Sequence, residues 1–380
     1  MDYLFFQHYW WAIVSLLGGI LVFLLFVQGG QGLLYVIGRT DAERKTIGYS
    51  LGRKWGLTFT TLVTFGGAFF ASFPLFYSTS FGGAFYVWML ILFVFVIQAA
   101  GYEFRNMPSN FLGERTFNAF LQINGILGPL LLGTAVATLF TGAQFTVNRL
   151  NLTEIGVPNT ISEWTTPWRG LDALVDYRNI SLGLAVLFLS RVLGLQYFIN
   201  DIDDKTITER SRKRLICASL SFLVFFLVFA VSLLFSKGYA VDRATGIISV
   251  ESYKYLNNLL QMPVVAVLFL AGVVSVLWGI WIGIRKASRC AIWFSGAGAV
   301  LTVFALLLLA GWNDTAYYPS LADMQSSLTI YNSSSSKFTL EAMSIVSLLI
   351  PFVLAYIWYV WRSMSRKQVT PQEAEEESGY

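Results

Sequence analysis

Long apolar stretches recur along the chain and alternate with polar segments. Nine stretches hold about 20 mostly apolar residues each, enough for a helix to cross a hydrocarbon core roughly 30 Å thick. They cover residues 12–36, 57–77, 84–104, 117–141, 180–199, 215–236, 264–284, 291–312 and 344–361. The pattern predicts an all-α polytopic membrane protein, built as two four-helix bundles plus one extra helix. Residues 1–369 form one membrane domain in this interpretation, and residues 370–380 form a disordered acidic cytoplasmic tail.

Lysine and arginine are distributed unevenly over the segments between these spans. The segments after spans 1, 3, 5 and 7, together with the C-terminal tail, carry 18 of them, and the alternate segments carry 7. The remaining one, Arg191, lies within span 5. Because basic residues stay on the cytoplasmic side, we expect the N-terminus outside and the C-terminus in the cytoplasm.

The composition excludes a water-soluble domain of ordinary type. Hydrophobic residues make up 56% of the chain and charged residues 13%, with a mean hydropathy of +0.61. Aromatic residues reach 16%, which suits helices flanked by aromatic belts at both membrane interfaces. The net charge of +4 reflects the cytoplasmic segments, so nothing in it indicates a nucleic-acid partner.

The chain contains a single histidine, His8. Membrane haem proteins hold iron with His–His or His–Met pairs that project into a bundle. His8 precedes the first span, so an interfacial hydrogen-bonding role is favoured over haem ligation. No Cys/His cluster predicts zinc, and no glycine pattern predicts nucleotide binding. We expect no catalytic residue, no haem ligand and no metal site in this chain.

Arg191 falls near the centre of span 5. A guanidinium at that depth costs several kcal/mol unless it is paired or hydrated. Three interpretations remain open. Arg191 faces a carboxylate or propionate of a partner subunit, or it reaches an internal hydrated pocket, or the boundary of the span is misplaced.

Polar residues also stand at the ends of spans 1 and 3. Glu103 and Arg105 could guide protons from the cytoplasm, although a capping and interfacial pair is favoured. Gln28 and Gln31 lie in the glycine-rich stretch 28–32, where small residues permit close helix packing and buried amides need partners. Packing is the favoured role for this stretch.

Several short stretches, in this order and at these topological positions, resemble subunit II of the cytochrome bd-type quinol oxidases. The likeness runs from Trp10 through nearly the full length. The stretches are Gly38-Arg39-Thr40-Asp41-Ala42-Glu43-Arg44, Lys54-Trp55, Gly66–Pro74, Gly101-Tyr102-Glu103-Phe104-Arg105, Phe140–Phe145 and Ser327–Ser335. None is decisive alone, and their order and spacing carry the match.

The resemblance implies a heterodimer with a haem-bearing subunit I in a bacterial cytoplasmic (inner) membrane. That partner would carry two haems b and one haem d, oxidise quinol and reduce oxygen to water with cytoplasmic protons, thereby generating proton motive force. Subunit II would ligate no haem and would support subunit I, with a structural quinone and a small single-span subunit as further expected partners. The candidate residues for a proton route or a subunit contact are Gln28, Trp55, Glu103, Arg105 and Arg191.

Two departures from the family pattern bear on proton transfer. Many family members carry an Asp-Gly-Phe-Asp type motif late in span 1, where this chain has Phe26-Val27-Gln28-Gly29. Many also read Trp-Asp-Gly-Asn at the start of span 2, where this chain has Trp55-Gly56-Leu57-Thr58. Two acids of the proposed route are therefore absent, so the route through subunit II is expected to be rerouted or lost.

A secondary transporter is the alternative from another functional class, because many helices with glycine interruptions and a central arginine also suit translocation. Against it, the spans show no paired broken helices in matching halves and few acids for ion coupling. A structural subunit of another respiratory complex is a third interpretation.

Overall fold

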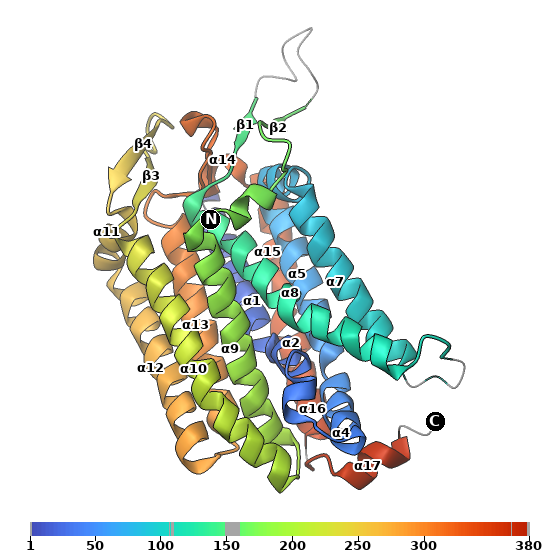
Figure 1. The fold of residues 1–380 in the computed structure, drawn as a ribbon. Coiled ribbons are helices and arrows are strands. Elements are labelled where there is room, and N and C mark those ends of the chain that lie inside the picture. The colour runs from blue at the N-terminus through green and yellow to red at the C-terminus, as the bar shows by residue number, and fades with distance from the viewer. Residues whose placement is uncertain (1, 106, 108–109, 149–159, 366, 378–380) are drawn as a thin grey trace.

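The computed structural model describes residues 2–105, 107, 110–148, 160–365 and 367–377, and helices dominate it (Figure 1). The long helices are α1 (Tyr3–Leu24) with its continuation α2 (Phe26–Gln31), α5 (Trp55–Ser72), α7 (Phe85–Phe104), α8 (Glu114–Thr141), α9 (Tyr177–Asp201), α10 (Lys205–Leu234), α12 (Pro263–Lys286), α13 (Ala291–Gly311), and α15 (Lys337–Ser347) followed by α16 (Ile350–Met364). Among the described residues, eight helical segments are long and apolar enough to cross a membrane, and a bent pair brings the number to nine.

Short elements occupy the two ends of the molecule. The short helices are α3 (Leu34–Ile37), α4 (Asp41–Gly52), α6 (Pro74–Phe76), the π-helix η1 (Tyr77–Phe81), η2 (Leu171–Leu174), α11 (Lys254–Gln261), η3 (Met324–Ser326), α14 (Ile330–Ser333) and α17 (Pro371–Glu377). Three antiparallel strand pairs are β1 (Phe145–Val147) with β2 (Ser162–Trp164), β3 (Lys237–Val241) with β4 (Ile248–Ser252), and β5 (Ala316–Tyr318) with β6 (Leu328–Thr329). We call the end with the strands the outer end and the end with α4 and α17 the inner end (Figure 1).

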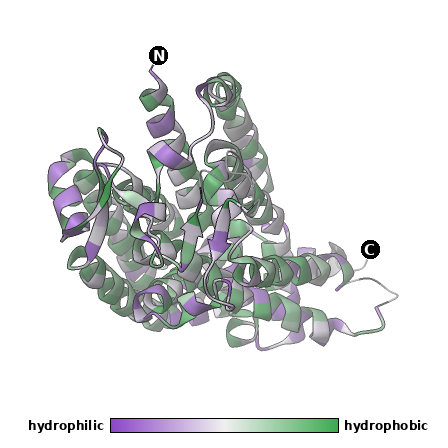
Figure 2. Cartoon of the chain, turned by 90° about the horizontal axis from the view of Figure 1, so that it is seen from above, coloured by the Kyte–Doolittle hydropathy of each residue, from purple (hydrophilic) through white to green (hydrophobic). Residues whose placement is uncertain are grey.

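The long helices form two groups of four. In the first group, α1 packs against α5, α2 against α8, and α7 against α8. In the second group, α9 packs along α10 and α12 along α13. Contacts of α1 with α13, of α2 with α9 and of α8 with α9 join the groups. Together with α15 and α16 as the extra helix, this confirms the predicted fold class. Hydrophobic residues dominate the helices in the view from the outer end (Figure 2).

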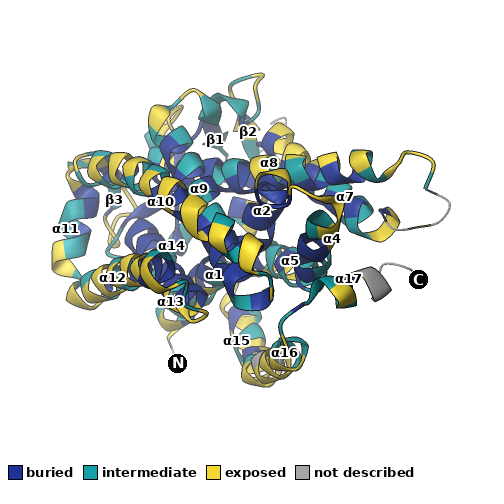
Figure 3. Ribbon diagram, turned by 60° about the horizontal axis from the view of Figure 1, so that its bottom comes forward, coloured by how far each residue is buried: buried dark blue, intermediate teal, exposed yellow. Residues whose placement is uncertain are grey.

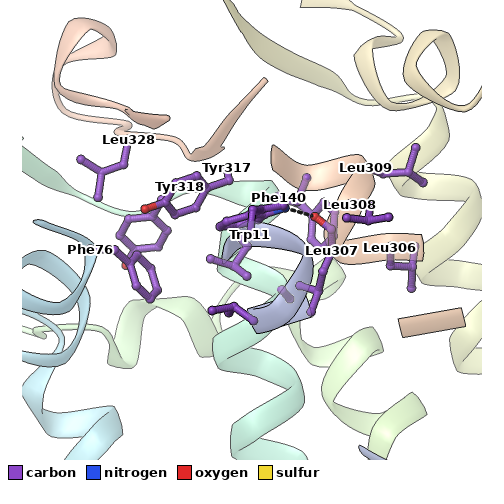
Figure 4. Close-up of a cluster of buried hydrophobic side chains, with 14 of the residues drawn as sticks. Trp11, Phe76, Phe140, Leu306, Leu307, Leu308, Leu309, Tyr317, Tyr318 and Leu328 are labelled. Carbon is purple, nitrogen blue, oxygen red and sulfur yellow. Dashed lines mark hydrogen bonds between the residues drawn. The ribbon is translucent and has the colours of Figure 1, made fainter. Parts of the chain in front are cut away.

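An aromatic core lies under the outer end. Trp11 is 1% exposed, and its indole Nε1 donates to the carbonyl oxygen of Leu307 at 2.9 Å. Its ring centroid lies 4.4 Å from that of Tyr317 (Figure 4). Tyr317 and Tyr318 of β5 are both buried, so the outer hairpin is packed into the top of the bundles rather than lying free above them.

The two groups of helices touch backbone to backbone at α2 and α9. A methyl group on Gly29 would overlap the carbonyl oxygen of Ser190, and one on Gly194 would lie 2.5 Å from the backbone nitrogen of Gly30. Because only hydrogen fits at these positions, glycine sets the separation of the helices. The packing role predicted for the glycine-rich stretch agrees with this contact.

Span 2 differs from the single stretch predicted over residues 57–77. Helix α5 ends at Ser72, and the chain turns by 113° into α6 and η1. Pro74 is the first residue of α6, and it has no backbone N–H to continue the hydrogen bonding of α5. The residues before Pro74 therefore form a shorter span than expected.

The C-terminal segment differs from the disordered tail expected from the sequence. Residues 371–377 form α17, which packs on α4, and Ala374 is fully buried. The backbone N–H of Val369 donates to the carbonyl oxygen of Asp201 at 2.7 Å, and the N–H of Asp203 donates to Val369 at 2.9 Å. The expectation of disorder is therefore wrong over residues 371–377. Residues 378–380 lie outside the described part of the chain.

The close contact between α2 and α9 gives a first prediction. Gly29→Ala should destabilise the protein by about 1–3 kcal/mol, because the added methyl group forces the two helices apart. The measurement is the thermal unfolding midpoint of the detergent-purified protein by fluorescence-detected size exclusion. Gly52→Ala is the matched control, since its methyl group would meet the Tyr102 ring at an ordinary 3.5 Å. Equal midpoints for the two variants would contradict the prediction.

Candidate functional site

Buried amide side chains meet between α2, α7 and α8. Gln28 and Gln98 are 0% exposed, and Gln28 Nε2 donates to Gln98 Oε1 at 3.3 Å. Asn124, also 0% exposed, donates through Nδ2 to the carbonyl oxygen of Val94 at 3.1 Å. A methyl group on Gly128 would lie within 4 Å of both Asn124 and Gln28, so the amides share one region.

A second polar layer lies one helical turn closer to the inner end. Gln31 Nε2 donates to the hydroxyl of Tyr102 at 2.8 Å. The ring of Trp55 stacks on that of Tyr102, with centroids 5.6 Å apart and planes 12° from parallel. Gln98 and Tyr102 are four residues apart on α7, so they project from the same helix face. We call Gln28, Gln31, Gln98, Tyr102 and Asn124 the amide column.

Several polar atoms of the amide column have no hydrogen-bond partner in the described protein. They are Gln28 Oε1, Gln31 Oε1, Gln98 Nε2 and Asn124 Oδ1. A buried amide atom without a partner costs about 1–3 kcal/mol. Such atoms are usually bound by internal water, provided that the site offers several polar groups. The column offers four amides and a hydroxyl.

An ion pair closes the column at the inner end. Arg105 follows the last residue of α7 and lies three residues beyond Tyr102. Its Nη2 lies 2.8 Å from Glu114 Oε1 at the start of α8. The Arg105 side chain is 5% exposed, whereas that of Glu114 is 42% exposed. A methyl group on Gly48 of α4 would overlap the Arg105 guanidinium, so α4 also packs against this pair.

Glu103 does not take part in this arrangement. Its side chain is exposed at the inner end of α7, and the partner of Arg105 is Glu114 rather than Glu103. Residues two apart on a helix point to different faces, so the pair considered from the sequence does not form. Gln98, Tyr102 and Glu114 were not predicted from the sequence as site residues. The spacing of Gln98, Tyr102 and Arg105 by four and three residues was the available signal.

Arg191 lies away from the amide column. It is half-buried in α9, ten residues before the C-terminal residue of that helix, so the helix does not end near it. Its guanidinium carbon is 5.4 Å from the centroid of the Phe188 ring. Among the described residues Arg191 forms no ion pair, and its Nε is buried without a hydrogen-bond partner.

An apolar cavity of about 520 Å³ lies between α5, α7 and α8. Val63, Gly67, Met89 and Leu92 line it and are also exposed on the outside of the molecule, so the cavity opens between α5 and α7. Trp88 lines this cavity and also a second, polar one nearer the outer end. An apolar chamber beneath a polar chamber is a shape that suits an amphiphile.

The polar cavity has a volume of about 510 Å³ and contains charged groups. Arg178 and Asp176 form an ion pair there, with Nη2 and Oδ2 2.6 Å apart. Burial raises the pKa of Asp176, but hydrogen bonds from Arg178 outweigh that effect and hold the pKa below its usual value. Thr141 donates to Asn179 Oδ1 at 2.7 Å in the same region.

His8 stands at the outer end of α1. Its Nδ1 lies 2.9 Å from the carbonyl oxygen of Leu4, and its ring lies beside Trp312 and Tyr331. The imidazole therefore does not project into either bundle. Within the described residues, no group of three His, Cys, Asp or Glu side chains could hold a metal ion.

Comparisons with known proteins bear on this architecture. The family model described as cytochrome bd terminal oxidase subunit II matches residues 6–364. A probable cytochrome oxidase subunit 2 of Haemophilus influenzae is 26% identical, over 95% of this chain and 94% of the relative. Cytochrome bd-I ubiquinol oxidase subunit 2 of Escherichia coli K12 is 26% identical over 99% and 98%. Cytochrome bd ubiquinol oxidase subunit 2 of Bacillus subtilis is 24% identical over 96% and 97%.

One of the solved structures has a fold similar to that of this chain. A chain of the bd oxidase from Geobacillus thermodenitrificans superposes with a TM-score of 0.63 at 15% identity, covering 96% of this chain and 99% of that one. The resemblance identified from the sequence is confirmed by the family model and by the named relatives. The transporter alternative finds no support in them.

The unequal exposure of Arg105 and Glu114 gives a second prediction. Glu114→Gln should lower stability by about 1–3 kcal/mol, because it leaves a buried guanidinium without a counter-charge. The thermal unfolding midpoint reports the effect. The double variant Arg105→Met/Glu114→Gln should recover part of the loss, since it removes the buried charge as well. A Glu114→Gln protein as stable as the unchanged one would show that this pair does not hold the guanidinium.

Proposed function

This chain belongs to the family of cytochrome bd terminal oxidase subunit II, and we propose its function on that basis. It is a multi-pass subunit of a bacterial membrane oxidase that couples quinol oxidation to the reduction of oxygen to water. The family model over residues 6–364 is the observation that carries this conclusion. We infer from the unequal distribution of lysine and arginine that the N-terminus lies outside and the C-terminus in the cytoplasm.

We propose that the complex is a heterodimer in which subunit I holds all the haems, two haems b and one haem d. The residues of this chain do not fit haem ligation. The only histidine, His8, lies at the outer end, where its Nδ1 faces the carbonyl oxygen of Leu4. A haem inside a bundle needs axial ligands that project from facing helices. This chain then supports subunit I and takes no direct part in electron transfer.

We propose that the apolar cavity between α5, α7 and α8 holds the isoprenoid tail of a structural quinone. Its volume of about 520 Å³ and its apolar lining, which includes Phe59, Leu62 and Phe95, suit such a tail. The polar cavity nearby, with Asn179 and Arg178, offers donors to the oxygen atoms of a ring. Trp88, which lines both cavities, would lie between tail and ring.

Purification of the tagged chain in mild detergent tests this function. We expect b- and d-type haem bands in the reduced-minus-oxidised optical spectrum, together with a histidine-rich membrane partner. Solvent extraction of the same sample should release quinone beyond the amount bound by subunit I alone. A colourless chain that purifies without a partner would overturn the function, and a coloured complex without this extra quinone would overturn only its placement in the cavity.

We further propose that the amide column is hydrated but does not deliver the protons consumed in water formation. Amides do not titrate, so Gln28 can relay a proton only through a bound water. Glu114 stands at the inner mouth of the column, where Arg105 holds it in an ion pair, and Glu103 faces away. The protons then reach the oxygen site through subunit I, and the route through subunit II is lost or rerouted in this chain.

Two substitutions test the proton route. Gln28→Leu removes the central amide, and Glu103→Gln removes the carboxylate nearest the inner end of α7. We expect each assembled complex to keep its turnover within about twofold, a change of less than 0.5 kcal/mol in activation free energy. The measurement is quinol-dependent oxygen consumption per haem d. Loss of turnover in both complexes, with the haem content retained, would show that protons do pass through this chain.

A further inference from the structure

Helices α8 and α9 touch in their outer halves and separate toward the inner end (Figure 1). In the outer halves, a methyl group on Gly133 would lie 2.8 Å from the Cα atom of Gly183, so the two backbones are in contact. In the inner halves, α2 lies beside both helices and contacts both (Figure 3). Gly125 of α8 and Ser190 of α9 lie against glycines of the stretch 28–32. The stretch therefore holds the inner halves of α8 and α9 apart.

The separation leaves one face of α8 open. Leu130 belongs to the face that meets α9, because a methyl group on Gly183 would lie 2.7 Å from its carbonyl oxygen. Ile126, four residues nearer the inner end, is 38% exposed, and Gln122, a further four residues on, is partly exposed. Residues spaced by four lie on one face of a helix. This face of α8 therefore points beside α9 into the surroundings of the molecule.

Arg191 stands on the outward face of α9 at the same level. Phe188 and Arg191, three residues apart, are both partly exposed. Leu195 and Phe198, the next residues on this face, are both 0% exposed and pack in one apolar cluster with α3. Arg191 is thus the last outward residue of α9 before α3 covers the helix.

Contacts with α12 fix the depth of Arg191. Gln196, five residues nearer the inner end, has its Nε2 3.6 Å from the place of a methyl group on Gly283. Helix α12 ends three residues beyond Gly283, with Arg285 and Lys286 in its last turn, and such residues mark the inner membrane surface. The Cα atom of Arg191 therefore lies about 8 Å deeper than Gly283. From that depth the long side chain can extend its guanidinium toward the inner interface.

The guanidinium of Arg191 has no counter-charge in its own chain. Among the described residues it forms no ion pair, and its Nε is buried without a hydrogen-bond partner. The Phe188 ring, 5.4 Å from the guanidinium carbon, stacks on Phe225 of α10 with centroids 5.7 Å apart, which fixes the side chain against the two helices. An unpaired charge at this depth is costly. Because Arg191 is partly exposed, an anion from outside the chain can reach it.

The surroundings of Arg191 are those of lipid. On α10, Leu220, Val224 and Leu227 are 64%, 49% and 57% exposed at helical spacing, while Phe222 and Phe229 are buried on the opposite face. Such one-sided exposure is typical of a helix that packs on its own chain and faces lipid with the other side. The anion that Arg191 meets here is therefore one that a lipid carries.

We propose that Arg191 binds the phosphodiester group of a phospholipid from the leaflet at the inner end. The planar guanidinium presents several N–H donors in a fixed fork that matches phosphate oxygens. Gln122 on α8 offers an amide donor to the same head group, and Ile126 and Phe188 offer apolar surface to the acyl chains. Basic side chains between helices at the cytoplasmic side suit anionic lipid head groups. This site goes beyond the oxidase function and does not depend on it.

Native mass spectrometry of the tagged chain, with the proteins that co-purify, tests the site. Arg191→Gln removes the guanidinium, and Arg214→Gln is the matched control, since Arg214 is exposed at the inner end of α10. We expect Arg191→Gln to lower the occupancy of the phospholipid that survives delipidation by about tenfold, and Arg214→Gln to leave it unchanged. Size exclusion shows that both variants fold. Equal phospholipid content in the two folded variants would overturn the proposal.

Two further measurements identify the source of the anion. Phosphatidylglycerol returned to the delipidated protein should raise the thermal unfolding midpoint of the unchanged chain but not that of Arg191→Gln. An equal rise with inorganic phosphate alone would show a site for free anions and overturn the lipid assignment. p-Benzoylphenylalanine in place of Ile126 should form phospholipid adducts in native membranes. Crosslinks to another protein instead would show that a partner chain occupies this face, which would also overturn it.

Discussion

The fold depends on the contact at which α2 and α9 approach without intervening side chains. Inside a membrane the hydrophobic effect does not drive helices together, so van der Waals packing and buried hydrogen bonds must hold the two bundles in register. Gly29, Gly30 and Gly194 bring the two backbones together, and the carbonyl of Ser190 lies against Gly29. The amide column lies on the other side of α2, so its position follows from the same contact. A shift of α2 away from α9 would also displace Gln28 relative to Gln98, its hydrogen-bond partner.

The long elements could be predicted from the sequence because membrane thickness imposes a minimum length on every span. The same rules say nothing about where a helix breaks within an apolar stretch. The turn after Ser72 depends on Pro74 and on the packing of Phe73 and Phe76, which are 0% and 4% exposed. The short helix after residue 370 was missed because its composition is that of a disordered segment, whereas Val369 and Ala374 are buried by contacts distant in sequence.

The site could be predicted only in part, for a related reason. A sequence shows which polar residues lie in a span but not which of them face one another. Gln28 and Arg105 were both candidates from the sequence. The structure places Gln28 of α2 against Gln98 of α7, and Arg105 follows the last residue of α7. Gln98 is uncharged and was not among the candidates, yet it is the hydrogen-bond partner of Gln28. A methyl group on Gly56, at the start of α5, would meet nothing within 4 Å, so this position borders open space.

The hydrogen bonds that join α1 to α15 and to the residues just before it have a consequence for biogenesis. Tyr3 and Trp10 bond to Ser335 and Leu340, which are synthesised more than 300 residues later. The first span must therefore wait in the membrane with its outer aromatic residues unpaired while all the others insert. A nascent chain cut short before α15 therefore lacks the partners of Trp10 on that helix.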